Sequence, residues 1–387
     1  MTIEHEISER YSRLPSSNFA KILKIAVEDK DVISLGPGEP DFTTPEHIRD
    51  AAIMAIDKGF THYSPPGGRT ETKETIAKKL KKDNRINVSP EEIIVTCGSQ
   101  EALFLATQSL IDPGEKMIVP NPGFLAFIPM VETLTGIPEP IPLREKNGFE
   151  FDPDELEKLI DRRTRVILIN SPSNPTGRML KRKTLEKLAD IAIQHDLVIF
   201  SDEAYEKLTY DNRKHISIGS LNGMKDRVIT FQSFSKSYAM PGFRIGYAAG
   251  PKDIIQAMTR LHIYTTVCAP TLSQLTAIEA LTGNQSCVKE MRTQYNRRRK
   301  LIIKRLKEIP DINCLQPEGA FYAFPNISKL GSSVEVANLF LKKAKVLVVP
   351  GTEFGKYGEG YVRMSYATSY EKIEEAMDRI EKVVKNR

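Results

Sequence analysis

The sequence contains little cysteine, and its four cysteines lack the spacing of a metal site or a disulfide framework. No two of Cys97, Cys268, Cys287 and Cys314 form a C-x-x-C pair, and no histidine cluster accompanies them. Unpaired cysteines without a ligand pattern are typical of proteins in a reducing compartment. We therefore expect a cytoplasmic protein that binds no metal.

Long hydrophobic runs are also missing. No apolar stretch approaches the ~20 residues that a membrane-spanning helix needs, and the first ten residues, MTIEHEISER, are too polar for a signal peptide. The net charge is only +5, and basic and acidic residues alternate along most of the chain. The densest basic run, residues 297–300 (RRRK), has no aromatic residues interleaved with it, so we interpret it as a solvated helix face. We expect neither a membrane nor a nucleic-acid partner.

Short runs of valine and isoleucine alternate with helix-like segments through the middle of the 387-residue chain. The expected strands span residues 92–96, 116–120, 165–170, 196–201, 227–231 and 244–249. Because buried parallel strands are continuous apolar runs separated by helices, this pattern predicts an α/β fold with a mostly parallel central sheet flanked by helices. The link between the last two strands is short for a crossover, so that pair is expected to be antiparallel or separated by another strand.

The pattern changes near Leu281, where long charged helices begin to frame short strands. This change predicts a second, smaller α+β unit. The segment before Pro45 is too short to fold alone and is expected to pack on that unit or on a partner chain. The expected division is an N-terminal arm (1–14), a small domain (15–44 with 284–387) and a large domain (45–283).

Polar residues gather where the predicted strands end, which is where open α/β sheets bind ligands. Gly98, Ser99 and Gln100 open a helix directly after the first strand, an arrangement that suits a phosphate group. Asn174 lies in the rigid turn SPSNPTG, and Asp202 follows a deeply apolar strand, where a carboxylate needs a cationic or donating partner. An ordinary Asx-type turn and a structural ion pair are the alternative interpretations of these two residues.

The stretch VITFQSFSKSYAMPGFRIGYAAG supplies a lysine and an arginine to the same sheet edge. Arg244 and Ser233 are suited to a phosphate, since the arginine fork is bidentate and always charged. Lys236 would then be free for covalent chemistry, because a partly buried lysine can lose its proton and act as a nucleophile or a base. An aldehyde, a phosphate and a ring nitrogen that pairs with a carboxylate such as Asp202 together describe pyridoxal 5'-phosphate.

The motifs GPGEPDF, NSPSNPTG, SDEAY, SFSKSYAMPGFRIGY and VRMSYA occur in this order over nearly the whole chain. Through these motifs the sequence resembles the fold-type I, pyridoxal phosphate-dependent aminotransferases of class I/II, in the aspartate/aromatic aminotransferase group. The resemblance implies a transferase that moves an amino group from an L-amino acid to a 2-oxo acid, with 2-oxoglutarate as the expected acceptor. It also implies a large cofactor-binding domain and a smaller α+β domain.

The family's roles carry over to matching positions. The resemblance implies that Lys236 bonds the cofactor and shuttles the substrate proton, that Asp202 holds the ring nitrogen and that Tyr205 contacts the ring hydroxyl. The implied cofactor-binding residues are Lys236, Gly98, Ser99, Gln100, Phe124, Asn174, Asp202, Tyr205, Ser233, Arg244 and Tyr63. The implied substrate-binding residues are Gly38, Asn174, Phe124 and Arg363.

Tyr63, in THYSPPGG, matches a tyrosine that reaches the phosphate of the neighbouring subunit, so the resemblance implies a homodimer. Three of the implied residues have simpler interpretations. Phe124 could belong to the core, Tyr63 could anchor a loop, and Arg363 could be a charge on an edge strand.

The amino donor is less sharply indicated. In an aspartate-specific branch a lysine follows the phosphate-turn glycines, and here that position is Gln100. The neighbourhood of Phe124, Phe127 and Tyr264 is expected to be apolar, which favours aromatic or other neutral donors. An aspartate or alanine aminotransferase, or a β-lyase on the same fold, remains an alternative. A ligand-sensing regulator is disfavoured, because no helix-turn-helix pattern precedes Ser34.

Overall fold

The computed structural model describes residues 8, 9, 11, 14, 24, 25 and 28–386. Most of the expected N-terminal arm, residues 1–14, lies outside this part of the chain. Within the described part, no helix has the length and apolar character needed to cross a membrane.

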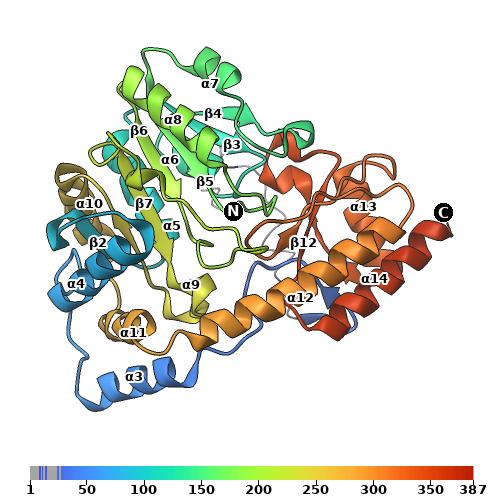
Figure 1. Ribbon diagram of the computed structural model, residues 1–387, viewed down its shortest axis with the longest axis horizontal. Helices are drawn as coiled ribbons and strands as arrows, with labels where there is room; N and C mark the ends of the chain where they lie inside the picture. Colours follow the sequence, from blue (N-terminus) through green and yellow to red (C-terminus); the bar gives the residue numbers. More distant parts are fainter. Residues whose placement is uncertain (1–7, 10, 12–13, 15–23, 26–27, 387) are drawn as a thin grey trace, which may run out of the picture.

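The centre of the molecule is a seven-stranded sheet with the strand order β2-β8-β7-β6-β5-β3-β4 (Figure 1). Neighbouring strands are parallel from β7 to β4, whereas β8 is antiparallel to both β2 and β7. The expected α/β fold, its mostly parallel sheet and the antiparallel pairing of the last two predicted strands are confirmed. The strands are Ile93–Thr96 (β2), Lys116–Asn121 (β3), Ile137–Pro142 (β4), Thr164–Asn170 (β5), Val198–Asp202 (β6), Val228–Ser233 (β7) and Gly246–Ala249 (β8).

Strand β4 was not among the predicted strands. Its sequence, IPEPIP, contains three prolines, and proline cannot donate to a strand ladder. The structure accommodates them because β4 pairs with β3 alone, at the edge of the sheet.

Helices cover both faces of the sheet (Figure 1). Ile94 packs in a cluster with residues of α5 and α10, whereas its neighbours Ile93 and Val95 pack with α4 and α11 on the opposite face. Because both faces are buried, polar side chains reach a ligand only at the strand ends. The covering helices are α4 (Thr70–Lys79), α5 (Ser99–Leu110), α6 (Phe127–Thr133), α7 (Pro153–Leu159), α8 (Arg182–Gln194), α10 (Lys252–Thr265) and α11 (Thr271–Thr282), and α3 (Glu46–Asp57) packs on α11.

The C-terminal third forms smaller sheets and long helices. A three-stranded antiparallel sheet has β12 at its centre, between β11 and β9, and β1 pairs with β10 in parallel. The segment before Pro45 therefore contacts the C-terminal part, while the division into domains stays a prediction. The elements are β1 (Ile33–Ser34), β9 (Tyr322–Ala323), β10 (Val346–Leu347), β11 (Val349–Pro350), β12 (Val362–Ser365), α12 (Ser286–Glu308), α13 (Ser333–Leu339) and α14 (Tyr370–Lys385), and α12 and α14 lie side by side (Figure 1).

The basic run of α12 is not a fully solvated face. Arg298 and Arg299 are buried, and each forms a two-pronged ion pair. Arg298 donates to both carboxylate oxygens of Asp41 at 2.7 and 2.8 Å, and Arg299 donates to Asp211 at 2.8 and 2.6 Å. The prediction is wrong for these two residues because carboxylates from distant segments match their guanidinium forks.

Candidate active site

A cavity of about 270 Å³ lies at the carboxyl ends of β5, β6 and β7, with β9 and β12 on another side. It gathers nearly all of the candidate site residues from segments far apart in the chain. Those that line it are Gly38, Gly98, Ser99, Gln100, Phe124, Asn174, Asp202, Tyr205, Ser233, Lys236, Arg244 and Arg363. Tyr63 is the one candidate that does not line it.

Lys236 lies on the short helix α9 (Phe234–Ser237) that follows β7. The Ser233 hydroxyl accepts the Ser235 N–H at 3.2 Å and so caps this helix, while the Lys236 ammonium donates to the Gly38 carbonyl at 2.6 Å. Burial, followed by the charge of Arg363, lowers the pKa of Lys236 to about 8. An amine with this pKa is neutral in a useful fraction of molecules near pH 7, as a nucleophile or a base requires.

Asp202 ends β6, where it lies in register with Asn170 on β5 and Phe231 on β7. Burial raises the pKa of Asp202 to about 7, against the opposing effects of a 3.2 Å hydrogen bond from the Ala204 N–H and the charge of Lys236. None of the ion pairs between described residues involves Asp202, so the structural ion pair considered above is not formed. A buried carboxylate of this kind is stabilised by a cationic group of a ligand.

Arg363 is 1 % exposed and lies on β12, the central strand of its sheet, so it is not an edge-strand charge. Its guanidinium donates to the Asn174 side-chain oxygen at 2.9 Å and to the Gly36 carbonyl at 2.6 Å. The Nε atom has no hydrogen-bond partner, and no carboxylate of the described residues pairs with the side chain. A buried cation without an anion is costly, and a planar carboxylate ligand would match its fork.

Asn174 is held in place by two contacts, one of them with Arg363. The backbone N–H of Asn174 donates to the Asn170 side chain at 2.8 Å, and the Asn174 side chain lines the cavity. Asn174 is therefore more than a residue of an ordinary turn, because the turn aims its side-chain oxygen at a buried cation.

The N-terminus of α5 and Arg244 form a cradle for an anion. Gly98 has φ +86°, and a Cβ at this position would lie 2.8 Å from Nη2 of Arg244. Glycine therefore permits both the turn and the close approach of the guanidinium. Free N–H groups at a helix start, together with an arginine, bind phosphate well. The cradle, the amine of Lys236 and the carboxylate of Asp202 are the donor set that pyridoxal phosphate requires, so the residues present fit this cofactor.

Tyr322 is a cavity residue that the sequence analysis missed. Its hydroxyl lies 2.7 Å from that of Tyr205, and its ring centroid lies 4.5 Å from the guanidinium carbon of Arg363. A Cβ at Gly38 would lie 2.1 Å from the same hydroxyl, so glycine is needed there. Nothing in the strand-like run GAFYAFP marks this tyrosine as polar-facing. Glu39, also missed, lines the cavity and could have been found within the motif GPGEPDF.

The expected apolar neighbourhood is only partly correct. Phe124 lines the cavity and contacts Phe127 edge to face, with 5.6 Å between the ring centroids. Phe127, however, is 1 % exposed and belongs to the core, and Tyr264 is 83 % exposed. Neither lines the cavity, because α6 turns Phe127 toward the sheet and α10 leaves Tyr264 on the surface. The apolar wall consists of Leu103, Phe124 and Leu125 instead.

Tyr63 lies outside the cavity of its own chain, with 83 % of its surface exposed. The loop is anchored by its neighbours, since the Thr271 hydroxyl donates to the His62 carbonyl at 2.7 Å and lies 2.8 Å from the Ser64 hydroxyl. The ring of Tyr63 is not needed as a loop anchor.

Comparison with known proteins shows the family to which the chain is related. Residues 30–380 match the family model for aminotransferases of class I and II. Similar proteins include an aspartate aminotransferase of Pyrococcus abyssi, 47 % identical over 98 % of this chain and 99 % of the relative. Aromatic-amino-acid aminotransferase 2 of Thermococcus litoralis is 46 % identical over the same shares.

Solved structures give the same result. The crystal structure of an aromatic aminotransferase from Pyrococcus horikoshii is 47 % identical with a TM-score of 0.91, covering 95 % of this chain and 99 % of that one. The structure of Thermus thermophilus aspartate aminotransferase with maleate is 37 % identical with a TM-score of 0.94, covering 98 % and 100 %.

Proposed function

The chain belongs to the class I and II aminotransferases, and from this premise we propose that Lys236, Asp202 and Arg363 carry its reaction. The enzyme depends on pyridoxal phosphate and transfers an amino group between an amino acid and a 2-oxo acid. When bound, the cofactor supplies an electron-withdrawing ring that acidifies the Cα–H bond of the substrate. One observation carries the proposed roles: the three side chains line one cavity, where Asp202 and Arg363 are buried and neither forms an ion pair with another described residue.

The roles follow from the chemistry of each group. Ser233, Arg244 and the α5 N-terminus would hold the phosphate, and Asp202 would face the ring nitrogen. Tyr205 and Asn174 offer donors to the ring hydroxyl. Each of these side chains is held by the sheet or by a hydrogen bond within the chain, so the site needs little rearrangement to bind its cofactor.

Two further groups act on the substrate. Arg363 would bind the α-carboxylate, which supplies the anion that its buried guanidinium lacks. Lys236, neutral in part because burial lowers its pKa to about 8, would take the α-proton and return it. Its contact with the Gly38 carbonyl holds the amine within the cavity before the cofactor binds.

We propose that the preferred donors are aromatic or other neutral L-amino acids, with 2-oxoglutarate as the acceptor. Gln100 is a neutral amide at the start of α5, and the apolar wall of Leu103, Phe124 and Leu125 lies nearby. Relatives with both aspartate and aromatic names are almost equally identical to this chain, so identity does not decide the donor.

Steady-state kinetics with tyrosine, phenylalanine, alanine and aspartate against 2-oxoglutarate tests this donor preference. The proposal expects the highest kcat/KM for tyrosine or phenylalanine, and a tenfold advantage for aspartate would overturn it. Product analysis separates the β-lyase alternative, since a lyase releases ammonia whereas a transaminase forms glutamate.

The substitution Gln100→Lys tests the same preference inside the cavity. A new ammonium at this position offers a partner to a distal carboxylate, and a hydrogen bond to a charged group contributes about 1.5–3 kcal/mol. We therefore expect the ratio of kcat/KM for aspartate to that for tyrosine to rise roughly 10-fold or more. Gln108→Lys, at an exposed position of the same helix, is the matched control and should leave the ratio unchanged. An unchanged ratio in the Gln100 variant would remove Gln100 from the donor site.

We also propose that the active enzyme is a homodimer in which Tyr63 completes the phosphate site of the partner subunit. Tyr63 is exposed and cannot serve the cavity of its own chain in this arrangement. Its loop is joined to α10 through the Pro66 carbonyl and His262. The nearby end of α10 exposes Ile263 and Tyr264, at 43 % and 83 %, which supports an interface at this place.

Subunit mixing gives a sharp test of the shared site. Tyr63→Ala and Lys236→Ala homodimers should each have low activity. In a mixed dimer, one site carries both defects while the other has a native lysine and a native partner tyrosine. We therefore expect mixing, after dissociation and reassociation, to restore up to about half of the native activity per mixed dimer. If Tyr63 served its own chain, no site of the mixed dimer would be intact and activity would not return.

We propose a cytoplasmic location for the enzyme. All four cysteines are free in the structure, as is usual where thiols are kept reduced. Fractionation of the source cells with an antibody to the protein would test this location.

A further inference from the structure

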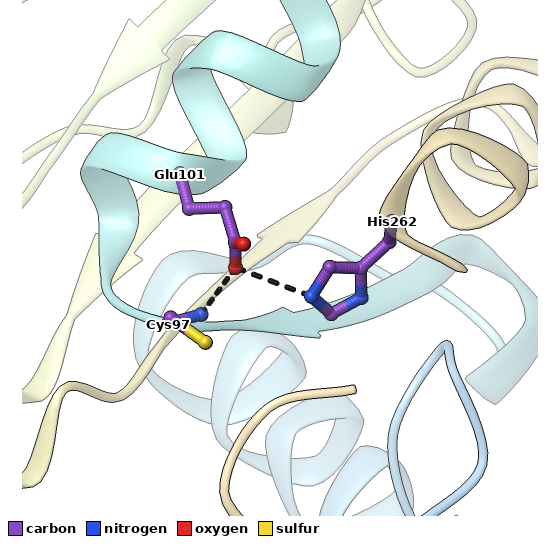
Figure 2. A group of neighbouring side chains, drawn as sticks. All are labelled: Cys97, Glu101 and His262. Carbon is purple, nitrogen blue, oxygen red and sulfur yellow. Dashed lines mark hydrogen bonds and ion pairs between the residues drawn. The ribbon is translucent and has the colours of Figure 1, made fainter. Parts of the chain in front are cut away.

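Three side chains form a polar cluster behind the phosphate cradle (Figure 2). Cys97 directly precedes Gly98, Glu101 lies in the first turn of α5, and His262 projects from α10. One carboxylate oxygen of Glu101, Oε2, accepts the backbone N–H of Cys97 at 2.6 Å and lies 3.2 Å from Nε2 of His262 (Figure 2). The proposed roles of the cavity residues do not use this cluster.

The protonation of His262 follows from its two neighbours. Its Nδ1 lies 2.8 Å from the Pro66 carbonyl, which can only accept, so Nδ1 carries a hydrogen. Its Nε2 faces the carboxylate of Glu101, and the His262 side chain is 0 % exposed. If Nε2 were unprotonated, its lone pair would face an anion in a buried site. A cation must therefore lie between the two groups, either a proton or a metal ion.

The contacts favour the proton. Both oxygens of Glu101 already accept hydrogen bonds, one from Cys97 N–H and the other from the Thr266 hydroxyl at 2.9 Å. Burial lowers the pKa of His262, but the polar neighbours Cys97 and Glu101 outweigh it and raise the pKa to about 10. Burial raises the pKa of Glu101, but the neighbouring His262 and the hydrogen bond from the Cys97 N–H outweigh that effect and lower the pKa to about 2. A metal ion would have to displace this proton with only three protein ligands.

Glu101 and His262 lie next to Cys97, the residue that directly precedes the phosphate-binding turn. Glu101 holds the Cys97 N–H, and the Cys97 carbonyl faces the guanidinium of Arg244 at 3.5 Å. The next residue, Gly98, has φ +86° and leads into the free N–H groups of α5. A glutamate that only caps a helix does not need a buried partner. Glu101, in contrast, contacts His262, which is fully buried and also contacts the Pro66 carbonyl.

We infer that His262 and Glu101 form a buried imidazolium–carboxylate pair that positions the phosphate-binding turn, and that both are positioning residues for cofactor affinity. The inference rests on the proposed phosphate site at Gly98 and Ser99. In this role the cluster connects the phosphate-binding turn, which follows β2, to α5, to α10 and to the loop before α4. Neither Glu101 nor His262 lines the cavity, so the effect of the pair should appear in cofactor binding before it appears in the chemistry.

The first test is the dissociation constant of pyridoxal phosphate, measured by absorbance titration of the cofactor-free full chain. Glu101→Ala removes the acceptor for Cys97 N–H, and we expect affinity to fall about 10-fold or more. Glu101→Gln keeps an oxygen that accepts the Cys97 N–H and removes only the negative charge that faces His262, so affinity should recover to within about threefold of native. Glu157→Ala, on exposed α7 surface, is the matched control with native affinity. Native affinity in a folded Glu101→Ala variant overturns the inference.

The second test reads the protonation state directly and needs no destabilised variant. In protein labelled with ¹⁵N-histidine, His262, assigned by its loss in His262→Gln, should give two protonated-nitrogen signals at pH 8. The Glu101→Gln variant should show the neutral form instead. A neutral His262 in the native chain overturns the inference, as does a loss of cofactor affinity after dialysis against EDTA that added Zn²⁺ restores. If the native chain itself binds no pyridoxal phosphate, the proposed function fails; if Glu101→Ala binds it normally, only this inference fails.

Discussion

Replacing Lys236 by alanine is expected to lower kcat for transamination by at least roughly 10⁴-fold. Proton transfer by a positioned base contributes roughly 10²–10⁴-fold by itself, and the variant also loses the amine that bonds the cofactor. Methyl-sized alanine leaves the rest of the cavity intact, including the phosphate cradle at Arg244. Initial rates of glutamate formation from 2-oxoglutarate, with each donor at saturation, give the measurement.

Two controls separate lost chemistry from lost structure. Lys225→Ala removes an exposed lysine and should keep native rates. The Lys236 variant should still bind pyridoxal phosphate through Arg244, Ser233 and Asp202, without a covalent bond. Turnover by a folded, cofactor-loaded Lys236→Ala variant within tenfold of native would contradict the role of this lysine.

Asp202→Asn has the second-largest expected effect, a loss of roughly 10²–10⁴-fold in kcat. The substitution preserves the size of the side chain and its ability to accept the Ala204 N–H, which lies at 3.2 Å. It removes only the charge that would face the ring nitrogen, and breaking a buried charge pair costs about 3–5 kcal/mol. The measurement is kcat at saturating donor and cofactor, so that weaker binding is not mistaken for slower chemistry.

Asp226→Asn, at an exposed position between β6 and β7, is the matched control and should have native kcat. A kcat within threefold of native in the Asp202 variant would mean that the carboxylate has a structural role. The raised pKa of Asp202, about 7 because of burial, would then have to be explained without a ligand.

The sheet and the position of its binding edge could be predicted from local pattern. Buried parallel strands read as apolar runs, and polar residues at or just after three of them line one cavity: Asn174 after β5, Asp202 at the end of β6 and Ser233 at the end of β7. These strands are neighbours in the sheet, and Asp202 lies in register with Asn170 on β5. Strand β4 was not predicted because its three prolines argue against a strand. Proline is tolerated at the edge of a sheet, and the sequence of one strand does not show whether that strand lies at an edge.

The direction in which a helical side chain points was harder to predict. Phe127 and Tyr264 were expected near the substrate, but one faces the core and the other the surface. Tyr322 was missed because an inward-facing tyrosine on a short strand resembles any core aromatic. The Glu101–His262 contact joins residues more than 160 positions apart, and only the packing of α10 against α5 brings them together.

Reduction of the cofactor-loaded native enzyme with borohydride, followed by mass spectrometry of its peptides, tests the central claim most directly. We expect the pyridoxyl group on Lys236 alone, in the peptide that follows β7, together with loss of the coloured absorption band. A label on another lysine, or no label on a preparation saturated with pyridoxal phosphate, would contradict the account of this cavity as the catalytic site.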